Sequence, residues 1–314
     1  MLSEKKRIYL SGKRGVDEKY KYTNEMFGTH KCLFEYPALI KNSPIKRIEI
    51  SGEEVLFVLT HKGIDILIAC DNRDANSLPM SYLNFTEYEA EEAEMILKLV
   101  KPGDVVFDIG ANIGWYAINI LLKHKGTVVH SFEPIKSSYT YLIKNLILNN
   151  QSADTAYNIG LSDENKSIEF YFDVECAMAS SMSDLRGSTN TVRESCQVKR
   201  LDDFVATIPT LSKLDFIKCD VEGAELMVFK GARHTIEKYQ PIVFSEILRK
   251  WSKKFGYHPN DLIGLFRELN YQCYIIRDNK IVEFGQVDEN TTETNYLFFH
   301  DKKHRDLVER LKSS

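Results

Sequence analysis

Paired cysteines, long apolar runs and any large excess of charge are missing from this chain of 314 residues. None of its six cysteines forms a CxxC pair, which argues against a zinc ribbon or a redox motif. No apolar run is long enough to cross a bilayer, and the first residues, MLSEKKRIYL, lack the apolar core of a secretory signal. We therefore expect reduced thiols, a cytoplasmic protein and no integral association with a membrane.

The charge balance argues against a further class of partner. The formal net charge is −4, from 41 Lys and Arg against 45 Asp and Glu. Such a chain has no general attraction to nucleic acid, and it carries no basic stretch interleaved with aromatic residues. We predict no nucleic-acid partner. The first thirty residues lean basic, and we interpret them as a solvated or frayed end.

From residue 86 onward, short apolar strands alternate with amphipathic helices. This alternation predicts an α/β fold, in which helices cover both faces of a mostly parallel sheet. Residues 46–70 instead predict a small antiparallel sheet. We therefore divide the chain into an N-terminal extension, residues 1–85, and a main domain, residues 86–314.

Two stretches near these elements are predicted in more detail. Thr86 followed by Glu87–Val100 has acidic residues in its first turns and an apolar face, which predicts a capped helix. Residues 177–191 are polar and rich in serine, which predicts a long loop or lid. An inserted loop of this length in a compact domain often carries function.

The segment VVFDIGANIG, residues 105–114, carries the clearest functional signal. An apolar strand ends in Asp108, and a tight turn with Gly110 and Gly114 then opens a helix. Glycine lets the backbone approach a ligand closely, and the helix N-terminus offers free N–H donors. Asn112 stands where the dinucleotide fingerprint GxGxxG has its second glycine. The Asp108 carboxylate would repel a pyrophosphate, so the turn favours a cationic cofactor such as S-adenosylmethionine.

Glu133 ends the next strand, in the sequence SFEP, 25 residues after Asp108. An acidic residue at about this distance commonly accepts hydrogen bonds from ribose hydroxyls. A carboxylate suits this role because it is acceptor-only and has room for both hydroxyls. The predicted cofactor-binding residues, taken together, are Asp108, Gly110, Ala111, Asn112, Gly114, Glu133, Pro134, Ser162 and Asp220.

A third group of charged residues, KCDVEGAE from Lys218 to Glu225, follows a later strand. Asp220 would point into the cleft beside the methyl donor. Glu222 and Glu225 either line the same cleft or cap the helix that follows, where a carboxylate is favoured by the helix dipole.

Together these motifs resemble the FkbM-type methyltransferases. The matching segments are VVFDIGANIGWYAI, SFEP followed by LIKNLILNN, FIKCDVEGAELMVFKGA and PIVFSEI, within about Tyr88 to Tyr274. The resemblance implies a Rossmann-like class I fold with seven strands, S-adenosylmethionine as methyl donor, and hydroxyl groups of sugars, glycans, lipids or polyketide products as acceptors. It also implies the roles of the matching positions: Asp108, Gly110, Asn112 and Gly114 in the cofactor turn, Glu133 at the ribose, and Lys218, Asp220, Glu222 and Glu225 in the acidic motif. The first 70 residues and the 177–191 loop match nothing known, and we expect the choice of substrate to lie there.

Methyl transfer to a hydroxyl needs a group that takes the proton of the acceptor. Asp220 is the first candidate base, Glu246 at the end of the next strand is the second, and His258 is the third. Asp220, Glu222 and Glu246 could gather around a divalent ion. Their spacing does not require one, so a metal is not favoured and no metal ligand is assigned.

We therefore predict an O-methyltransferase that acts on a small-molecule or saccharide acceptor in glycan or natural-product biosynthesis. Two alternatives stay open. An NAD(P)-dependent oxidoreductase would use a similar sheet, but the missing GxGxxG counts against it. A non-catalytic S-adenosylmethionine-binding protein would have lost the chemistry, but the intact Asp220 counts against that. The sequence does not predict the oligomeric state.

Overall fold

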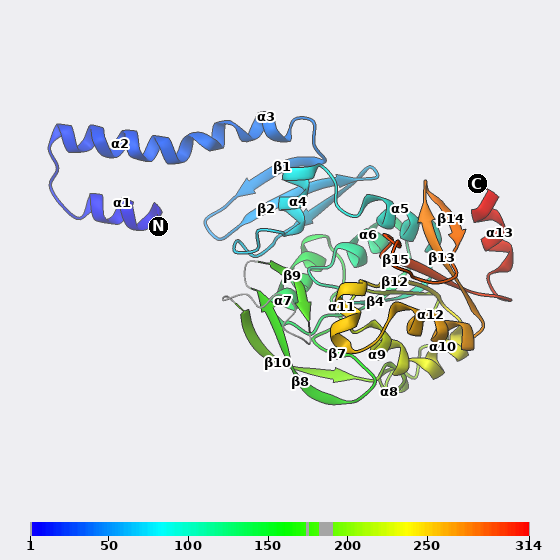
Figure 1. The fold of residues 1–314 in the computed structure, drawn as a ribbon. Coiled ribbons are helices and arrows are strands. Elements are labelled where there is room, and N and C mark those ends of the chain that lie inside the picture. The colour runs from blue at the N-terminus through cyan, green and yellow to red at the C-terminus, as the bar shows by residue number, and fades with distance from the viewer. Residues whose placement is uncertain (1, 174–175, 182–190, 314) are drawn as a thin grey trace.

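The computed structural model describes residues 2–173, 176–181 and 191–313 (Figure 1). Its centre is an eight-stranded sheet with the order β14-β13-β15-β12-β11-β4-β5-β6. Neighbouring strands from β12 to β6 are parallel, whereas β15, β13 and β14 pair antiparallel. The strands are β4 (Val105–Ile109), β5 (Val128–Phe132), β6 (Ala156–Tyr157), β11 (Phe216–Cys219), β12 (Ile242–Glu246), β13 (Tyr271–Arg277), β14 (Lys280–Glu283) and β15 (Asn295–His300).

This sheet confirms the predicted Rossmann-like α/β class. Seven strands form the expected mostly parallel sheet, and β14 adds an eighth at the edge because residues 278–279 turn the chain back on β13. The chain runs outward from β4 to β5 and β6 on one side and later returns to β11 and β12 on the other. The strand order therefore reverses between β4 and β11, where α/β sheets bind ligands.

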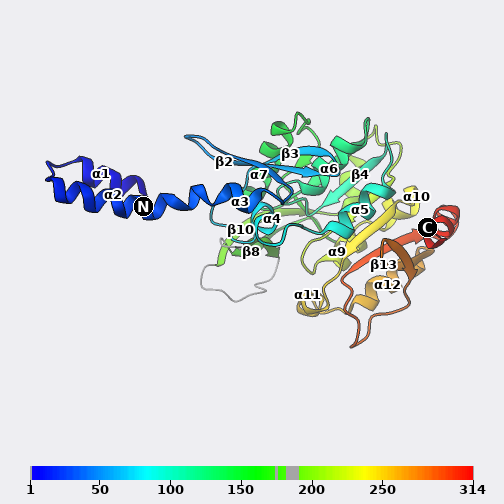
Figure 2. The same ribbon diagram turned by 90° about the horizontal axis from the view of Figure 1, so that it is seen from above.

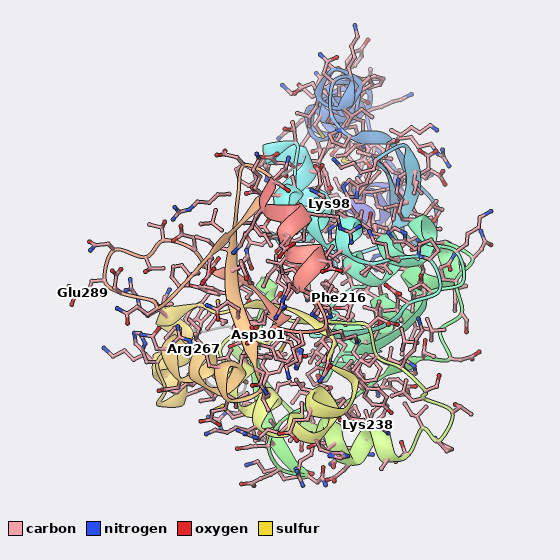
Figure 3. All side chains as sticks on the ribbon, turned by 90° about the vertical axis from the view of Figure 1, so that its right-hand side faces the viewer. Lys98, Phe216, Lys238, Arg267, Glu289 and Asp301 are labelled. Atoms are coloured by element: carbon pink, nitrogen blue, oxygen red, sulfur yellow. The ribbon has the colours of Figure 1, made fainter. Side chains whose placement is uncertain are left out.

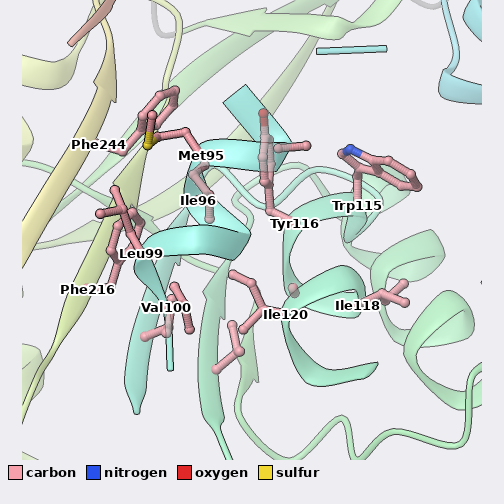
Figure 4. Packing of buried hydrophobic residues seen from close by; sticks show 14 of the residues in the cluster. Met95, Ile96, Leu99, Val100, Trp115, Tyr116, Ile118, Ile120, Phe216 and Phe244 are labelled. Atoms are coloured by element: carbon pink, nitrogen blue, oxygen red, sulfur yellow. The ribbon is translucent and has the colours of Figure 1, made fainter. Parts of the chain in front are cut away.

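Helices cover both faces of the sheet, as the alternation predicts. Along β4, Val106 packs into the core on one face, whereas Phe107 and Ile109 pack on the other. Figure 4 shows the first face, where Met95 and Leu99 of α5 lie against the sheet. The helices of the first face are α5 (Ala90–Leu99), α6 (Trp115–Lys123), α7 (Lys136–Leu148) and α13 (Arg305–Ser313), and those of the second are α8 (Leu201–Ala206), α9 (Glu225–Lys230), α10 (Arg233–Tyr239) and α12 (Pro259–Glu268).

The layers place apolar residues inside and charged ones outside. In Figure 3, Phe216 lies in the interior of the body, whereas Lys98, Lys238 and Glu289 lie at its surface. Five of the six cysteines have described side chains, and these five are free thiols. In the described part of the chain, no helix is both long and apolar enough to span a membrane.

The predicted antiparallel sheet of the extension is present as β1 (Ile45–Ile50), β2 (Val55–His61) and β3 (Ile64–Ile68). Two asparagines of α7 tie β3 to the main domain. The Asn145 amide accepts from the Ala69 N–H and donates to the Ala69 carbonyl, at 2.8 and 3.0 Å. Asn149 pairs with both backbone groups of Leu67 in the same way. These side chains act toward β3 as a neighbouring strand would.

Two local predictions need correction. The helix expected from Thr86 begins later, because Thr86 ends α4 (Leu78–Phe85) in a left-handed conformation and α5 starts at Ala90. In the stretch expected to be a loop, residues 177–181 belong to β9 (Cys176–Ser181), while residues 182–190 lie outside the described residues. Strand β9 belongs to a second sheet of order β7-β10-β8-β9, with β7 (Gly160–Leu161), β8 (Lys166–Asp173) and β10 (Thr191–Lys199).

Residues 2–40 form a helical arm, which is solvated as one of the two predicted alternatives has it but is not frayed. Figures 1 and 2 show this arm projecting away from the body. It contains α1 (Leu2–Leu10), α2 (Val16–His30), the 3-10 helix η1 (Lys31–Phe34) and α3 (Tyr36–Ile40), and none of these elements has a buried residue. Remaining short elements are α11 (Arg249–Ser252) and the 3-10 helix η2 (Lys253–Phe255).

Candidate functional site

A cavity of about 440 Å³ lies where the strand order reverses. Its size falls within the usual range of small-molecule sites. We call its two sides the floor and the roof. The floor is made by residues at the carboxyl ends of the parallel strands, Ile109–Asn112, Glu133, Pro134, Lys218, Asp220 and Glu246; the roof is made by the lining residues between Cys70 and Glu89 and by Ser137, Ser138 and Tyr141 of α7.

The glycine turn of the floor is fixed by its neighbours. Gly110 has a φ of +78°, and a Cβ at this position would lie 1.8 Å from the Asp220 carbonyl oxygen. The N–H groups of Gly110 and Ala111 both donate to the Phe132 carbonyl at 3.0 Å. Only glycine therefore fits at 110. The two N–H groups hold the turn against β5, so they are not free donors for a ligand.

The end of the turn is tied to Glu133. Asn112 is left-handed, with a φ of +48°, and its N–H donates to Oε2 of Glu133 at 2.9 Å. The Ile135 N–H donates to Oε1 at 2.8 Å. Burial raises the pKa of Glu133 to about 7, although these two N–H groups act in the opposite direction. Gly114, with a φ of +94°, caps α6, and a Cβ there would meet Leu142 at 2.8 Å.

Asp108 lies directly behind the floor. It is fully buried, and it does not line the cavity, whereas Ile109 and Lys218 do. Neither carboxylate oxygen has a hydrogen-bond partner of good geometry among the described residues. Burial raises the pKa of Asp108, and the Lys218 ammonium, 3.6 Å from Oδ1, offsets only part of this effect. A direct contact between Asp108 and a ligand is therefore not part of this geometry.

Lys218 connects the parts of the floor. Its Nζ donates to the Gly110 carbonyl at 3.0 Å and lies 3.5 Å from Oδ2 of Asp220 and 3.6 Å from Oδ1 of Asp108. Burial disfavours its charge, yet attraction to Asp220, Asp108 and Glu89 leaves its pKa above the ordinary value. The lysine is thus a charged structural link, and its charge is already shared among carboxylates.

Asp220 and Glu246 meet at the ends of β11 and β12. Burial, followed by the charges of Asp220, Glu222 and Glu89, raises the pKa of Glu246, which also shares a hydrogen bond with Asp220. Burial therefore favours the protonated form of Glu246 beside Asp220.

Glu89 is a site residue that sequence reasoning missed. It precedes α5 in a left-handed conformation, with a φ of +43°, and lines the cavity. The Tyr116 hydroxyl donates to its Oε2 at 2.6 Å. Burial, followed by the charge of Asp220, raises the pKa of Glu89. The sequence offered only the pair Tyr88-Glu89 at the start of a helix, where an acidic residue is ordinary.

Three predicted or possible site residues lie elsewhere. Ser162 does not line the cavity, because it packs on the break between α9 and α10; a Cβ on Gly231 would lie 2.1 Å from its carbonyl oxygen. His258 is exposed at the start of α12 and accepts from the Asn260 N–H at 3.2 Å. Glu225 is buried and accepts from the N–H groups of Val221 and Gly223, so it holds the turn that precedes α9. Glu222 does line the cavity.

The cavity is strongly acidic. Among the described residues that line it, seven carry carboxyl groups and Lys218 alone carries a positive charge. These acids do not form a metal centre, because no group of three or more His, Cys, Asp or Glu in the described part of the chain is placed to hold an ion. The arrangement suits an organic cation better than an anion.

Comparison with known proteins identifies the family of this chain. A family model described as the methyltransferase FkbM domain matches residues 108–273, from the buried aspartate behind the floor to β13. The chain belongs to the FkbM methyltransferase family. The matched range contains every floor residue and the three roof residues of α7, whereas the roof residues between Cys70 and Glu89 lie before it.

Two relatives illustrate how much of an FkbM protein is shared. Methyltransferase 1 of Beauveria bassiana is 28% identical over 143 residues, which are 40% of this chain and 57% of the relative. The 31-O-demethyl-FK506 methyltransferase FkbM of Streptomyces tacrolimicus is 46% identical over 48 residues, 15% of this chain and 18% of the relative. The chain thus spans less than two thirds of either relative.

Among solved structures, a methyltransferase FkbM from Methylobacillus flagellatus KT is similar at a TM-score of 0.40 and 18% identity. The match covers 73% of this chain and 55% of that one.

Proposed function

We propose that this FkbM-family chain transfers a methyl group from S-adenosylmethionine to a hydroxyl oxygen of a sugar, glycan or secondary-metabolite acceptor. The observation that carries the proposal is the charge of the cavity, with seven carboxyl groups around one lysine that is already engaged. S-adenosylmethionine brings an ammonium and a sulfonium, which such a cavity favours. NAD would place a pyrophosphate among the same carboxylates, at a cost that nothing in the cavity offsets.

The residues of the floor fit the two ends of this cofactor. Each Glu133 oxygen accepts one backbone N–H and keeps a lone pair, so Glu133 can also accept from two ribose hydroxyls. Pro134 lines the cavity beside it, and Gly110 allows close approach to the backbone. Asp220 on the floor and Glu89 at the edge of the roof would both face the cationic end. Asp108 would act on the cationic end only indirectly, because it lies 3.6 Å from Lys218, which lines the cavity.

When bound, the cofactor supplies an electrophilic methyl carbon. Asp220 would take the proton of the acceptor hydroxyl as its oxygen is methylated. Glu246 donates its hydrogen bond to Asp220 and so fixes the orientation of that carboxylate. A base of this kind contributes about 10²- to 10⁴-fold to the rate.

The roof supports a hydroxyl-rich acceptor. Ser77, Ser81, Ser137, Ser138 and Tyr141 line it, together with Asp71 and Asp74. These groups can donate to and accept from sugar-like hydroxyls. Most of them belong to the extension before residue 86, and we propose that residues 1–85 select the acceptor while residues 86–314 bind the donor.

Calorimetry tests the donor first, in separate titrations with S-adenosylmethionine, S-adenosylhomocysteine and NAD. We expect binding of the first two and none of NAD. Transfer of a labelled methyl group to a panel of polyhydroxylated acceptors then tests the reaction. NAD binding without S-adenosylmethionine binding would overturn the proposal, whereas labelled product with an N-methyl linkage would overturn only the acceptor atom.

A further inference from the structure

The helical arm carries large apolar side chains that no other part of the described chain covers. Val16, Tyr20, Phe27 and Phe34 are 72, 68, 61 and 77% exposed. Isolated helices of this length are marginal in water, and most of the stability of a helix in a protein comes from packing. The arm therefore lacks the contacts that ordinarily hold such helices.

These four side chains, together with Thr23 and His30 between them, form one continuous stripe. Its members are spaced by 4, 3, 4, 3 and 4 residues, which is the heptad spacing of a helix that packs along another helix. The first five lie on α2, and the last, Phe34, lies on the 3-10 helix η1 that follows it. We define the stripe as Val16, Tyr20, Thr23, Phe27, His30 and Phe34, all of which are exposed.

Helix α1 does not cover the stripe, because it packs on another side of α2. The rings of Tyr9 and Tyr22 stack with centroids 3.9 Å apart, and Lys5 donates to Glu25 at 2.6 Å. Tyr22 lies well around the helix from the stripe at 100° per residue. The arm is thus a helical hairpin. One face of α2 packs against α1, and the face that carries the stripe is exposed.

We propose that the stripe pairs with the same stripe of a second copy of this chain, antiparallel and about a two-fold axis. An antiparallel pair sets Val16 opposite Phe34, Tyr20 opposite His30, and Thr23 opposite Phe27. Each of these pairs then joins a large aromatic ring with a smaller side chain. The two-fold symmetry produces a second copy of each pair. A parallel pair would instead stack Tyr on Tyr and Phe on Phe, with small residues alone in the layers between.

The charges beside the stripe fit the same arrangement. Asp17 and Lys31 each follow a stripe residue and lie on the same flank of the helix, two heptads apart. Antiparallel pairing brings Asp17 of one copy to Lys31 of the other, twice per dimer. Neither residue is in an ion pair within the described part of the chain. The arm projects from the body (Figure 2), so its stripe is accessible to a second copy.

Analytical ultracentrifugation of the full chain tests the pairing. We expect a dimer at micromolar concentration and a monomer for Phe27→Glu. Phe85→Glu is the matched control, since Phe85 is 71% exposed and lies on the body; this variant stays dimeric. Circular dichroism checks that the helices persist. A monomeric wild type, or a dimeric Phe27→Glu, overturns the proposal.

A charge swap tests the antiparallel direction. Asp17→Lys and Lys31→Asp should each raise the dissociation constant about tenfold, because two attractions become two repulsions. The double variant restores the original charge pairs and should return to the wild-type dissociation constant. Failure of this rescue overturns the antiparallel arrangement. A monomer that cosediments with phosphatidylglycerol vesicles, and loses this binding on Phe27→Glu, overturns the dimer in favour of a lipid surface. None of these readouts depends on methyl transfer.

Discussion

The floor and the roof of the cavity are held in place by different kinds of contact. On the floor, two backbone N–H groups meet the Phe132 carbonyl, and the buried Lys218 joins the glycine turn to the strand ends. On the roof, Asp71 pairs with Arg73, whose side chain is 62% exposed. An exposed pair of this kind contributes little to stability.

This difference separates the two tasks of the site. A floor built from buried backbone contacts tolerates few substitutions, so it suits a ligand that stays the same. The roof depends less on backbone contacts of this kind, and its partly exposed side chains, such as Ser81 and Tyr141, can change at smaller cost to the fold. We infer that the donor is bound by the rigid side and the acceptor is chosen by the adaptable one. The variants below test that division, from the largest expected effect to the smallest.

Gly110→Ala should abolish donor binding, because its Cβ would lie 1.8 Å from the Asp220 carbonyl oxygen and the floor would have to open. Calorimetry with S-adenosylmethionine and thermal melting measure the effect. Gly126→Ala is the matched control, with a similar φ of +77° but no atom closer than 3.8 Å; it should lose about 1 kcal/mol of stability and keep its affinity. Equal behaviour of the two variants would contradict the close contact.

Asp220→Asn should lower kcat about 10²- to 10⁴-fold while donor affinity changes only a few-fold. Glu246→Gln is the control within the pair. Glutamine can donate the same hydrogen bond as the protonated carboxyl, so we expect a much smaller loss of kcat. Steady-state kinetics with a labelled methyl group compare them. If Glu246→Gln were the more damaged enzyme, the roles of the two carboxyls would be reversed.

Donor affinity should rise about tenfold between pH 6 and pH 8, because ribose hydroxyls donate to the ionised form of Glu133 and its pKa is about 7. The free energy of unfolding should instead fall as the pH rises. Burial raises this pKa above the ordinary 4.5, so the folded state gains from the protonated carboxyl at low pH and loses that gain as the pH rises through 7. Calorimetry and urea unfolding across this range measure both slopes, and Glu133→Gln should flatten them. A slope that persists in Glu133→Gln belongs to another group.

Tyr141→Phe should raise KM for the acceptor by about tenfold or less, since a hydrogen bond to a ligand contributes roughly 1 kcal/mol. Donor affinity should not change, because Tyr141 lies on the roof. Tyr139→Phe, on the same helix, removes a hydroxyl that bonds to the Ala156 carbonyl and does not line the cavity. It should leave both constants unchanged. A loss of donor affinity in Tyr141→Phe would move this residue to the donor side.

The floor was largely predictable from sequence. Glu133 and Asp220 each follow an apolar strand, and the carboxyl ends of parallel strands meet at one edge of the sheet. That reasoning identifies which residues converge but not what each one touches. It could not show that Lys218 stands between Asp108 and the cavity, since this depends on side-chain packing across two strands.

The roof and the arm were not predictable for physical reasons. Glu89 reaches the cavity because the chain is left-handed at both Thr86 and Glu89, a backbone choice that no local pattern requires of these residue types. The helices of the arm bury no residue, and Thr23 and His30 interrupt the apolar residues of the stripe, so the segment resembled a solvated end. His258 and Ser162 were chosen for their residue types, and the fold turns both away from the cavity.

The asparagine clamp between α7 and β3 has a consequence for synthesis. Asn145 is fully buried, also donates to the Ile113 carbonyl at 2.9 Å, and meets Ala69 from 76 positions later in the chain. On the ribosome, β3 therefore emerges well before the side chains that complete its edge. During that interval the edge is open to other strands, as unpaired edges are. Arrival of α7 closes this edge and fixes the end of the glycine turn in one event, so the nascent extension is protected at the moment when the donor site takes shape.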